Sequence, residues 1–221
     1  DSDASPGALL SSTAEGITVQ GSKGALTCTN LTTLEGDAIR EADLAKHGLL
    51  AGATLPGWAV PLAEAASNLD REVTKSERFW MRRLQALSIP QLNELKGHAP
   101  TGQTASVDVP LASALLALPS ESQHAMLVAG LAVYAARTND EVTTVDIPVC
   151  VATLPDDLTQ LYSPTVPLSF EVDSQATWQT VQHHAGEELR TATARGTYAR
   201  DIWMRYSALR GKSATERQMS I

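Results

Sequence analysis

The residues best suited to proton transfer in this 221-residue chain are its five histidines, two of which are adjacent. His183 and His184 form a pair, and Glu188 follows five residues after the first of them. A histidine beside a carboxylate can exchange a proton near neutral pH. The pair falls inside a long amphipathic segment, however, where residues four apart share one face of a helix. The spacing therefore predicts a His184–Glu188 pair on a solvated helix face rather than a catalytic site.

Other residue types that carry chemistry are scattered. Cys28 and Cys150 are far apart and neither lies in a C-x-x-C pair, so two reduced thiols are favoured over a disulfide. His47 precedes Gly48 and is expected at the C-terminal end of a helix. The sequence has no G-x-S-x-G elbow, no glycine-rich phosphate loop and no metal-ligand spacing. We therefore predict no metal and no directly bound cofactor.

The composition argues against two classes of partner. Acidic residues outnumber basic ones by 25 to 17, and the formal net charge of -8 disfavours a nucleic-acid surface, which needs clustered Lys and Arg. No apolar run approaches the ~20 residues that cross a bilayer, and the residues from Asp1 onward lack the pattern of a signal peptide. Hydrophobic residues make up 43% of the sequence, which predicts a folded chain. We expect a cytoplasmic protein with no nucleic-acid, membrane or metal partner.

Strands and helices alternate along the chain, which favours an α/β or α+β fold with a mixed sheet and flanking helices. Residues 1–16, rich in Ser, Ala, Gly and Asp, predict a flexible tail. Strands are expected at 17–20, 25–31, 105–109, 142–152 and 166–172. Helices are expected at 35–50, 62–69, 74–87, 120–137 and from about 174 to 193, followed by a loop or broken helix at 198–210. Pro and Gly at 91–104 predict a linker between a first lobe, 17–90, and a second, 105–221.

Three segments predict which side chains are buried. The helix over 120–137 carries Leu127, Leu131 and Tyr134, and the small residues between them would let it lie close to a sheet. These small residues are Ala125, Ala129, Gly130, Ala132 and Ala135. The helix over 177–193 carries a second apolar stripe, formed by Trp178, Val181, Ala185, Leu189 and Ala192. In the strand over 142–152, Asp146 is expected on the face opposite the apolar residues, and Pro148 indicates an edge or a bulge. All four tryptophans are expected to be core or lobe-packing residues.

The loop after the first hairpin has the spacing of a known motif. Asn30-Leu31-Thr32-Thr33-Leu34-Glu35-Gly36 follows a strand and precedes an expected helix. In this order it resembles the His-His-x-x-x-Asp-Gly motif of nonribosomal peptide synthetase condensation domains, which have the chloramphenicol-acetyltransferase-like fold. Asn30 and Leu31 occupy the two histidine positions, Glu35 the aspartate position and Gly36 the glycine position. Only Gly36 is unchanged.

Further segments resemble the same family in the same order. They are the helix around Glu77–Leu84, the helix and strand from Gln123 to Pro148, Ser163–Leu168, the helix Thr177–Thr193, and Tyr198–Asp201 at the place of a partner-facing loop. The resemblance covers about residues 17–221. A complete family domain is about twice this length, so the chain is expected to be an incomplete piece that carries parts of two lobes.

The resemblance implies amide-bond formation between aminoacyl or peptidyl thioesters held on carrier proteins. The second motif histidine of the family orients or deprotonates the attacking amine, which Leu31 cannot do, so no catalytic residue is intact. A loss of ~10²–10⁴-fold in rate is expected. The implied partners are carrier-protein and adenylation domains of the same synthetase, in secondary-metabolite biosynthesis, and the only implied cofactor is the carriers' phosphopantetheine.

Three alternatives stay open at this point. The first is a non-catalytic docking domain that binds a carrier protein or a tailoring enzyme. The second is a stand-alone acyltransferase that uses a coenzyme A thioester. The third is an ordinary strand, turn and helix with no catalytic history.

Overall fold

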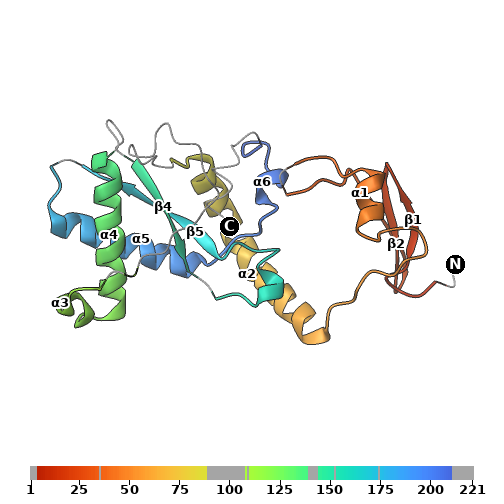
Figure 1. Ribbon diagram of the computed structural model, residues 1–221, viewed down its shortest axis with the longest axis horizontal. Coiled ribbons are helices and arrows are strands. Elements are labelled where there is room, and N and C mark those ends of the chain that lie inside the picture. Colours follow the sequence, from red (N-terminus) through yellow and green to blue (C-terminus); the bar gives the residue numbers. More distant parts are fainter. Residues whose placement is uncertain are drawn as a thin grey trace. The chain divides into compact units, whose positions relative to one another are not determined.

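The structure, a computed structural model, describes residues 4–34, 36–88, 108, 110–138, 144–151, 153–173 and 175–210. Over this part of the chain the fold is mixed α/β, with two small sheets and several helices (Figure 1). Both sheets are antiparallel, so the expected mixed sheet is not found among the described strands. The described residues belong to two compact units: unit 1 comprises 4–71 and 203–210, and unit 2 comprises 72–202.

The sheet of unit 1 contains three strands in the order β1 (Leu9–Thr13), β2 (Gly16–Gly21) and β3 (Gly24–Thr29). The predicted hairpin is confirmed, because Gly21 pairs with Gly24 across a two-residue turn. The expectation of a tail without regular structure over 1–16 is wrong for β1, which pairs with β2. Leu9, 2% exposed, is its one buried side chain. A strand with a single buried residue lacks the alternating pattern that would have predicted it.

The first helix, α1 (Glu41–Lys46), is much shorter than the predicted 35–50. It starts late because a bridge between Thr32 and Ala38 holds the preceding residues as a tight loop. It ends as predicted. Gly48 has φ 72°, the Gly48 N–H donates to the Ala45 carbonyl at 3.0 Å, and the Leu49 N–H donates to the Leu44 carbonyl at 2.9 Å. This is a Schellman end, which favours glycine.

One continuous helix, α2 (Val60–Gln85), replaces the two helices predicted at 62–69 and 74–87. No Gly or Pro separates those segments, and the residues between them include good helix formers. An ion pair between Glu72 and Lys75, 2.7 Å long, lies on the surface of the joined region. The division between the two units falls within this helix.

Unit 2 is built around the two-stranded sheet of β4 (Thr144–Cys150) and β5 (Thr165–Glu171). Its other elements are α3 (Ser113–Leu116), α4 (Ser120–Thr138), the short 3₁₀ helix η2 (Asp156–Leu158) and α5 (Trp178–Arg195). Helix α4 packs against α5, and each contacts one strand, α4 against β4 and α5 against β5 (Figure 1). The strands and helices predicted at 120–137, 142–152, 166–172 and 177–193 are confirmed within a few residues.

Prolines face each other within this sheet. Pro148 is opposite Pro167, and the register shows no bulge. Asp146 and Ser169 also face each other, and their backbone N–H groups point away from the partner strand. N–H direction repeats every two residues along a strand, so Pro148 and Pro167 also occupy positions where the partner strand needs no N–H. The prediction that Pro148 marks an edge is confirmed for the described strands, and the missing N–H groups discourage further strand pairing there.

Small side chains form the buried face of α4, as predicted from their close-packing role. Leu127, Leu131 and Tyr134 are 44%, 51% and 48% exposed. The buried side chains of the helix are instead Ala125, Ala129, Ala132 and Ala135. They are buried because α4 lies against α5, whose Ala185 and Gly186 are also buried. Small side chains allow two helices to approach closely, and this contact outweighs burial of the larger side chains.

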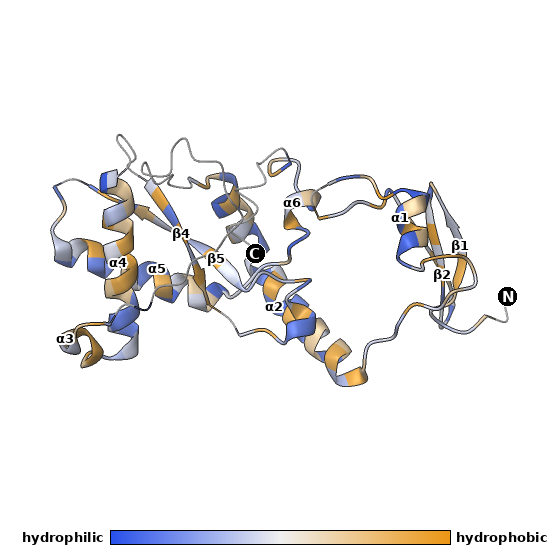
Figure 2. Ribbon diagram, in the orientation of Figure 1, coloured by the Kyte–Doolittle hydropathy of each residue, from blue (hydrophilic) through white to orange (hydrophobic). Residues whose placement is uncertain are grey.

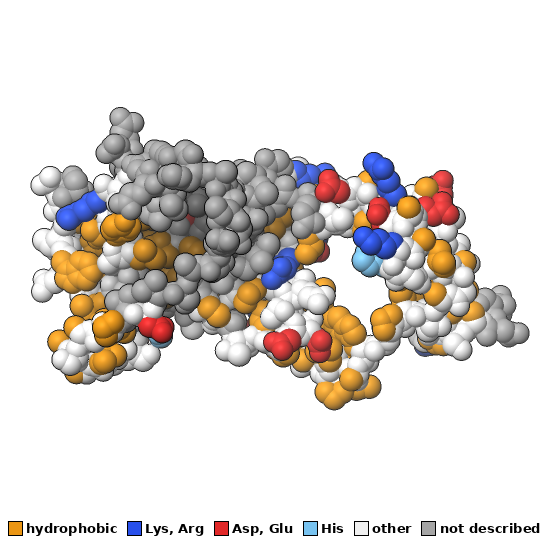
Figure 3. Space-filling model, viewed as in Figure 1, with side chains coloured by type: hydrophobic (Ala, Val, Ile, Leu, Met, Phe, Trp, Pro, Cys, Tyr) orange, Lys and Arg blue, Asp and Glu red, His pale blue; other side chains and the backbone are white. Residues whose placement is uncertain are grey.

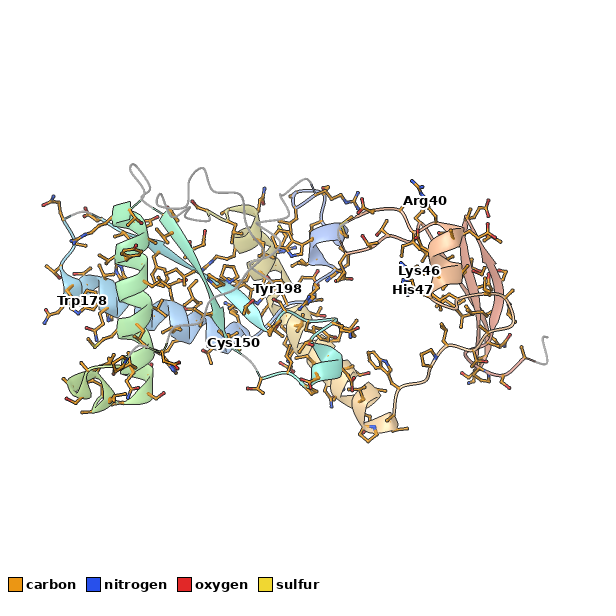
Figure 4. All side chains as sticks on the ribbon, in the orientation of Figure 1. Arg40, Lys46, His47, Cys150, Trp178 and Tyr198 are labelled. Atoms are coloured by element: carbon orange, nitrogen blue, oxygen red, sulfur yellow. The ribbon has the colours of Figure 1, made fainter. Side chains whose placement is uncertain are left out.

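Aromatic residues divide between core and surface. Trp80 and Trp203 are buried as predicted, whereas Trp58 and Trp178 are 48% and 44% exposed, so the prediction is wrong for those two. Within unit 2, Tyr198 is buried against Trp80, with ring centroids 5.7 Å apart (Figure 4). The partner-facing loop expected at 198–201 therefore begins with a core residue.

The broken helix predicted over 198–210 contains one helical turn, α6 (Ile202–Arg205). The linker predicted at 91–104 lies outside the described residues, as does most of the strand predicted at 105–109. The lobe boundaries therefore stay a prediction. None of the helices in the described ranges is both long and apolar enough to cross a membrane.

Candidate functional site

The loop that follows β3 holds the four motif-equivalent positions. Asn30 has φ 54°, a left-handed conformation that turns the chain out of the strand. The Leu31 carbonyl accepts a hydrogen bond from the Ile39 N–H at 3.0 Å, so the chain returns beside itself eight residues later. Glu35, at the aspartate position, lies outside the described residues.

Gly36 is the best-defined position of this loop. Its N–H donates to the Thr33 carbonyl at 3.1 Å, and its φ of 94° is one that side-chain-bearing residues rarely adopt. A Cβ atom at this position would stand 2.8 Å from Cε and 3.1 Å from Sδ of Met204. The backbone angle and the close approach of a side chain therefore both favour glycine.

The described side chains of the loop offer no acid–base group for neutral pH. Leu31 is partly buried and aliphatic, Asn30 is exposed, and Asp37, an exposed carboxylate, is the one ionisable side chain among residues 30–34 and 36–39. A carboxylate is a weaker proton acceptor for an ammonium group than an imidazole is. The loop has a specific backbone shape but lacks the imidazole that the resemblance requires.

The histidine pair lies on the exposed side of α5, with ring centroids 6.3 Å apart. His183 lines a hollow of about 420 Å³ between α4 and α5, together with Gln179, Gln182 and Arg190. The predicted His184–Glu188 pair is wrong, because the Glu188 carboxylate reaches Arg83 instead. His47 caps the end of α1, as predicted, on unit 1 (Figure 4).

An ion pair that the sequence did not predict joins α2 to α5 in unit 2. Arg83 donates from Nη1 and Nη2 to the two carboxylate oxygens of Glu188, at 2.5 and 3.3 Å. The side chains are only 16% and 24% exposed. Glu188 also accepts the outward N–H of Ser169 at 3.2 Å. The guanidinium lies 5.1 Å from the ring centroid of Phe79, whose ring is also approached by Arg195 at 5.1 Å.

Asp146 is the most deeply buried carboxylate of the described residues, at 2% exposure. It forms a reciprocal pair with Ser88 just beyond α2: the Asp146 N–H donates to the Ser88 carbonyl at 3.0 Å, and the Ser88 N–H donates to Oδ2 at 2.5 Å. Its Oδ1 has no hydrogen-bond partner. Burial raises the pKa of Asp146, and the nearby Glu188 adds to the increase, while hydrogen bonds from Ser88 and Ser169 and the charge of Arg83 oppose it.

Asp146 and Glu188 together secure the outer edges of the small sheet. Asp146 ties β4 to the residues after α2, and Glu188 ties β5 to α5 and, through Arg83, to α2. The sequence signal for the first was a carboxylate between apolar residues in Val145-Asp146-Ile147. No short-range spacing links Arg83 to Glu188, which are 105 residues apart. These hydrogen bonds and the ion pair join neighbouring elements of unit 2, so the geometry indicates a structural role.

Among the residues that the structure describes, no group of three His, Cys, Asp or Glu side chains could hold a metal ion. Cys28 and Cys150 form no disulfide in the structure. In comparisons with known proteins, no family model, no curated protein and no solved structure matches this chain.

Proposed function

We propose that this chain is part of a condensation-type domain of a cytoplasmic nonribosomal peptide synthetase, with the chloramphenicol-acetyltransferase-like fold and with impaired catalysis. The proposal is supported by the order of the segments that resemble this family and by the observed strand, loop and helix at β3, residues 30–39 and α1. Carrier-protein and adenylation domains would be its partners, and the carriers' phosphopantetheine would deliver the substrates.

One observation carries the proposal: Gly36 keeps the loop tightly folded beside Met204, while the position of the catalytic base is Leu31. A φ of 94° is open to glycine and rarely to other residues, so this turn depends on Gly36. In the proposed register, the shape of the motif is retained without its proton acceptor. Such a domain would bind thioester substrates but deprotonate the attacking amine ~10²–10⁴-fold less effectively than a histidine-bearing one.

The test is an amide-forming assay with loaded donor and acceptor carrier proteins, run on the longest native form of the protein. We expect slow product formation that rises when Leu31→His is introduced together with Asn30→His. The matched control is Leu34→His, which adds an imidazole to the same loop at a 41% exposed position. Fast wild-type turnover that is unaffected by Leu31→Ala would show that the assigned register is wrong.

A non-catalytic docking domain is the second candidate, and the absence of a neutral-pH base among the described loop residues favours it. In this role the chain would bind a carrier protein or a tailoring enzyme and form no bond. Titration calorimetry with a phosphopantetheine-bearing carrier protein separates the two candidates. Binding without turnover, in both the wild type and the Leu31→His variant, supports docking, and a failure to bind contradicts both.

A further inference from the structure

A hollow of about 520 Å³ lies beside helices α2 and α5, and all of its lining residues belong to unit 2. The two helices meet at the Arg83–Glu188 ion pair, and this α2–α5 hollow is lined further along both of them, around Ser76 and Arg195. Its volume is in the range of about 300–1,000 Å³ that small-molecule sites occupy. A Cβ atom at Gly196, which ends α5, would meet nothing within 4 Å, so there is open space on that side.

The lining of the α2–α5 hollow is mostly polar. Hydrophilic and hydrophobic positions alternate along α2 (Figure 2), and Figure 3 shows Lys and Arg side chains lying among acidic and hydrophobic ones on the face in view. The hollow gathers two cations, one carboxylate and three hydroxyl groups. They belong to Glu72, Lys75, Ser76, Thr191, Thr193 and Arg195. Two positive charges and one negative charge leave a local net charge of +1, opposite in sign to the -8 of the whole chain.

Ser76 is the most buried polar side chain of the lining, at 7% exposure. A serine inside a helix can donate to the carbonyl one turn earlier, as Ser67 of the same helix does to Ala63 at 2.9 Å. The Ser76 hydroxyl makes no hydrogen bond with any residue that the structure describes, and it lines the hollow. Because buried polar groups are nearly always hydrogen-bonded, this hydroxyl indicates a partner inside the hollow.

Arg195 supplies a cation that no carboxylate neutralises within the described part of the chain. Its guanidinium lies 5.1 Å from the ring centroid of Phe79, a contact that orients it. The other guanidinium at this ring, that of Arg83, is already paired with Glu188. Arg195 in the last turn also offsets the partial negative charge at the end of α5, but that role leaves its N–H donors available.

Lys75 is a second cation that can reach a bound anion at low cost. Its Nζ lies 2.7 and 2.8 Å from the two carboxylate oxygens of Glu72, and these side chains are 67% and 68% exposed. Exposed ion pairs of this kind contribute little to stability, so Lys75 can exchange its partner for a ligand. The Glu72 carboxylate repels an anion, so removing its charge should strengthen anion binding rather than weaken it.

We propose that the α2–α5 hollow binds the phosphate group of a phosphorylated small molecule. A phosphate monoester has three terminal oxygens and carries nearly two negative charges at neutral pH. The planar guanidinium of Arg195 is suited to donate to two of these oxygens at once, and the Ser76 hydroxyl can donate to another. The rest of the volume accommodates the group that carries the phosphate.

The test is an NMR titration of the whole chain with inorganic phosphate, at about pH 7.5 and constant ionic strength. We expect saturable amide shifts confined to residues 72–79 and 191–196, with a Kd on the order of 1 mM, typical of a few charge-assisted hydrogen bonds. Glycerol 3-phosphate should bind at least as tightly, because the hollow has room for the glycerol. Shifts that grow linearly over the whole surface, or failure of glycerol 3-phosphate to bind, would overturn the proposal.

Three variants test the assigned residues. Arg195→Gln should weaken phosphate binding at least ~10-fold, the effect of losing charge-assisted hydrogen bonds, and Ser76→Ala should weaken it by a smaller factor. Glu72→Gln should strengthen binding. The matched control is Arg78→Gln, at an exposed arginine of the same helix that does not line the hollow, which should leave the Kd unchanged.

The same spectra show whether each variant is folded, and the loss for Arg195→Gln and the gain for Glu72→Gln are independent readouts. Equal weakening by Arg195→Gln and Arg78→Gln would mean that phosphate responds to net charge alone, and it would overturn the site. An unchanged Kd for Ser76→Ala, or weaker binding by Glu72→Gln, would do the same. The site requires nothing of the proposed synthetase role, so either can fail without the other.

Discussion

Gly36 shows at the scale of one residue how a backbone angle restricts the residue type. Its φ of 94° and the approach of Met204 both act on this position, and neither depends on the identity of Leu31. The turn therefore favours glycine whichever side chain stands at position 31. This reasoning predicts a stability cost for changing the glycine, independent of any activity.

Gly36→Ala is expected to lower the free energy of unfolding by about 1–3 kcal/mol, the cost of a non-glycine residue in such a conformation. Urea denaturation measures the loss, and hydrogen exchange at the amides of residues 31–39 shows where it falls. Gly57→Ala is the control, because a Cβ there meets nothing within 4 Å. Adding Met204→Ala to Gly36→Ala should recover only the part of the stability loss that comes from contact between the new Cβ and Met204. If Gly36→Ala and Gly57→Ala lost equal stability, the inference that the backbone at position 36 requires glycine would be wrong.

Asp146 makes the stability of unit 2 depend on pH. Burial raises its pKa in the folded state above the unfolded value of about 3.9, so between these two values the folded protein binds more protons than the unfolded one. The stabilisation from the protonated form is complete below the unfolded pKa. It is lost as pH rises through the folded pKa.

Asp146→Asn removes this dependence while keeping an oxygen that can accept the Ser88 N–H. We therefore expect the stability of the variant relative to the wild type to increase as pH rises from 4 to 8. Urea denaturation across that range provides the measurement, and the exposed Asp37→Asn serves as the control. If the stability of Asp146→Asn relative to the wild type stayed constant or fell as pH rose, the raised pKa of Asp146 would be contradicted.

At the scale of elements, helix α4 illustrates how packing selects a face. Its leucine stripe and its alanine stripe both have helical spacing, and hydropathy favours the leucines. Close approach of α5 buries the alanines instead, since Ala129 and Ala185 are each 0% exposed. The larger side chains Leu127, Leu131 and Tyr134 are left exposed.

This arrangement predicts opposite effects for two substitutions on one helix. Ala129→Leu should destabilise the protein by about 1–3 kcal/mol, because added methylene groups have no room between α4 and α5. Leu127→Ala should change stability by no more than about 0.5 kcal/mol, because this side chain is exposed. Thermal or urea unfolding compares them directly. If Leu127→Ala proved the more damaging, the assignment of the buried face would be wrong.

The sheet of unit 2 shows a second element-scale rule. Pro148 and Pro167 are tolerated in adjacent strands because their missing N–H groups lie outside the ladder. The remaining outward N–H groups at Asp146 and Ser169 are met by Ser88 and by Glu188. A two-stranded sheet is marginal on its own, so these edge contacts and the covering helices stabilise it.

At the scale of the whole molecule, the chain has two compact units with separate buried residues. Leu44, 3% exposed, belongs to unit 1, and Leu168, 0% exposed, belongs to unit 2. Each unit can therefore lose stability by its own route, as regions of unequal stability do in native-state hydrogen exchange.

Leu44→Ala and Leu168→Ala should each cost about 2–5 kcal/mol, the usual range for such truncations in a core. The loss should appear in the amide protection of the substituted unit alone: β1–β3 for Leu44→Ala, and β4–β5 for Leu168→Ala. Hydrogen exchange read by mass spectrometry resolves the two sets. Equal loss in both units from either variant would show that they unfold as one.

The sequence by itself determined the features that depend on near neighbours in the chain. The β2–β3 hairpin, the end of α1 at Gly48 and the bounds of α4 and α5 follow from local periodicity, turn residues and caps. Prediction from the sequence failed where the local signal was weak. It missed β1, and it divided the single helix α2 into two helices.

Only the tertiary structure decided which faces and charges are buried. The alternation along β4 predicts an outward-facing Asp146, yet the segment after α2 covers this side chain. Glu188 is spaced to pair with His184, yet its carboxylate pairs with Arg83. Both outcomes depend on contacts between residues 58 and 105 positions apart. Periodicity reports that a helix or strand has two faces, but the neighbour that packs against it determines which face leaves the solvent.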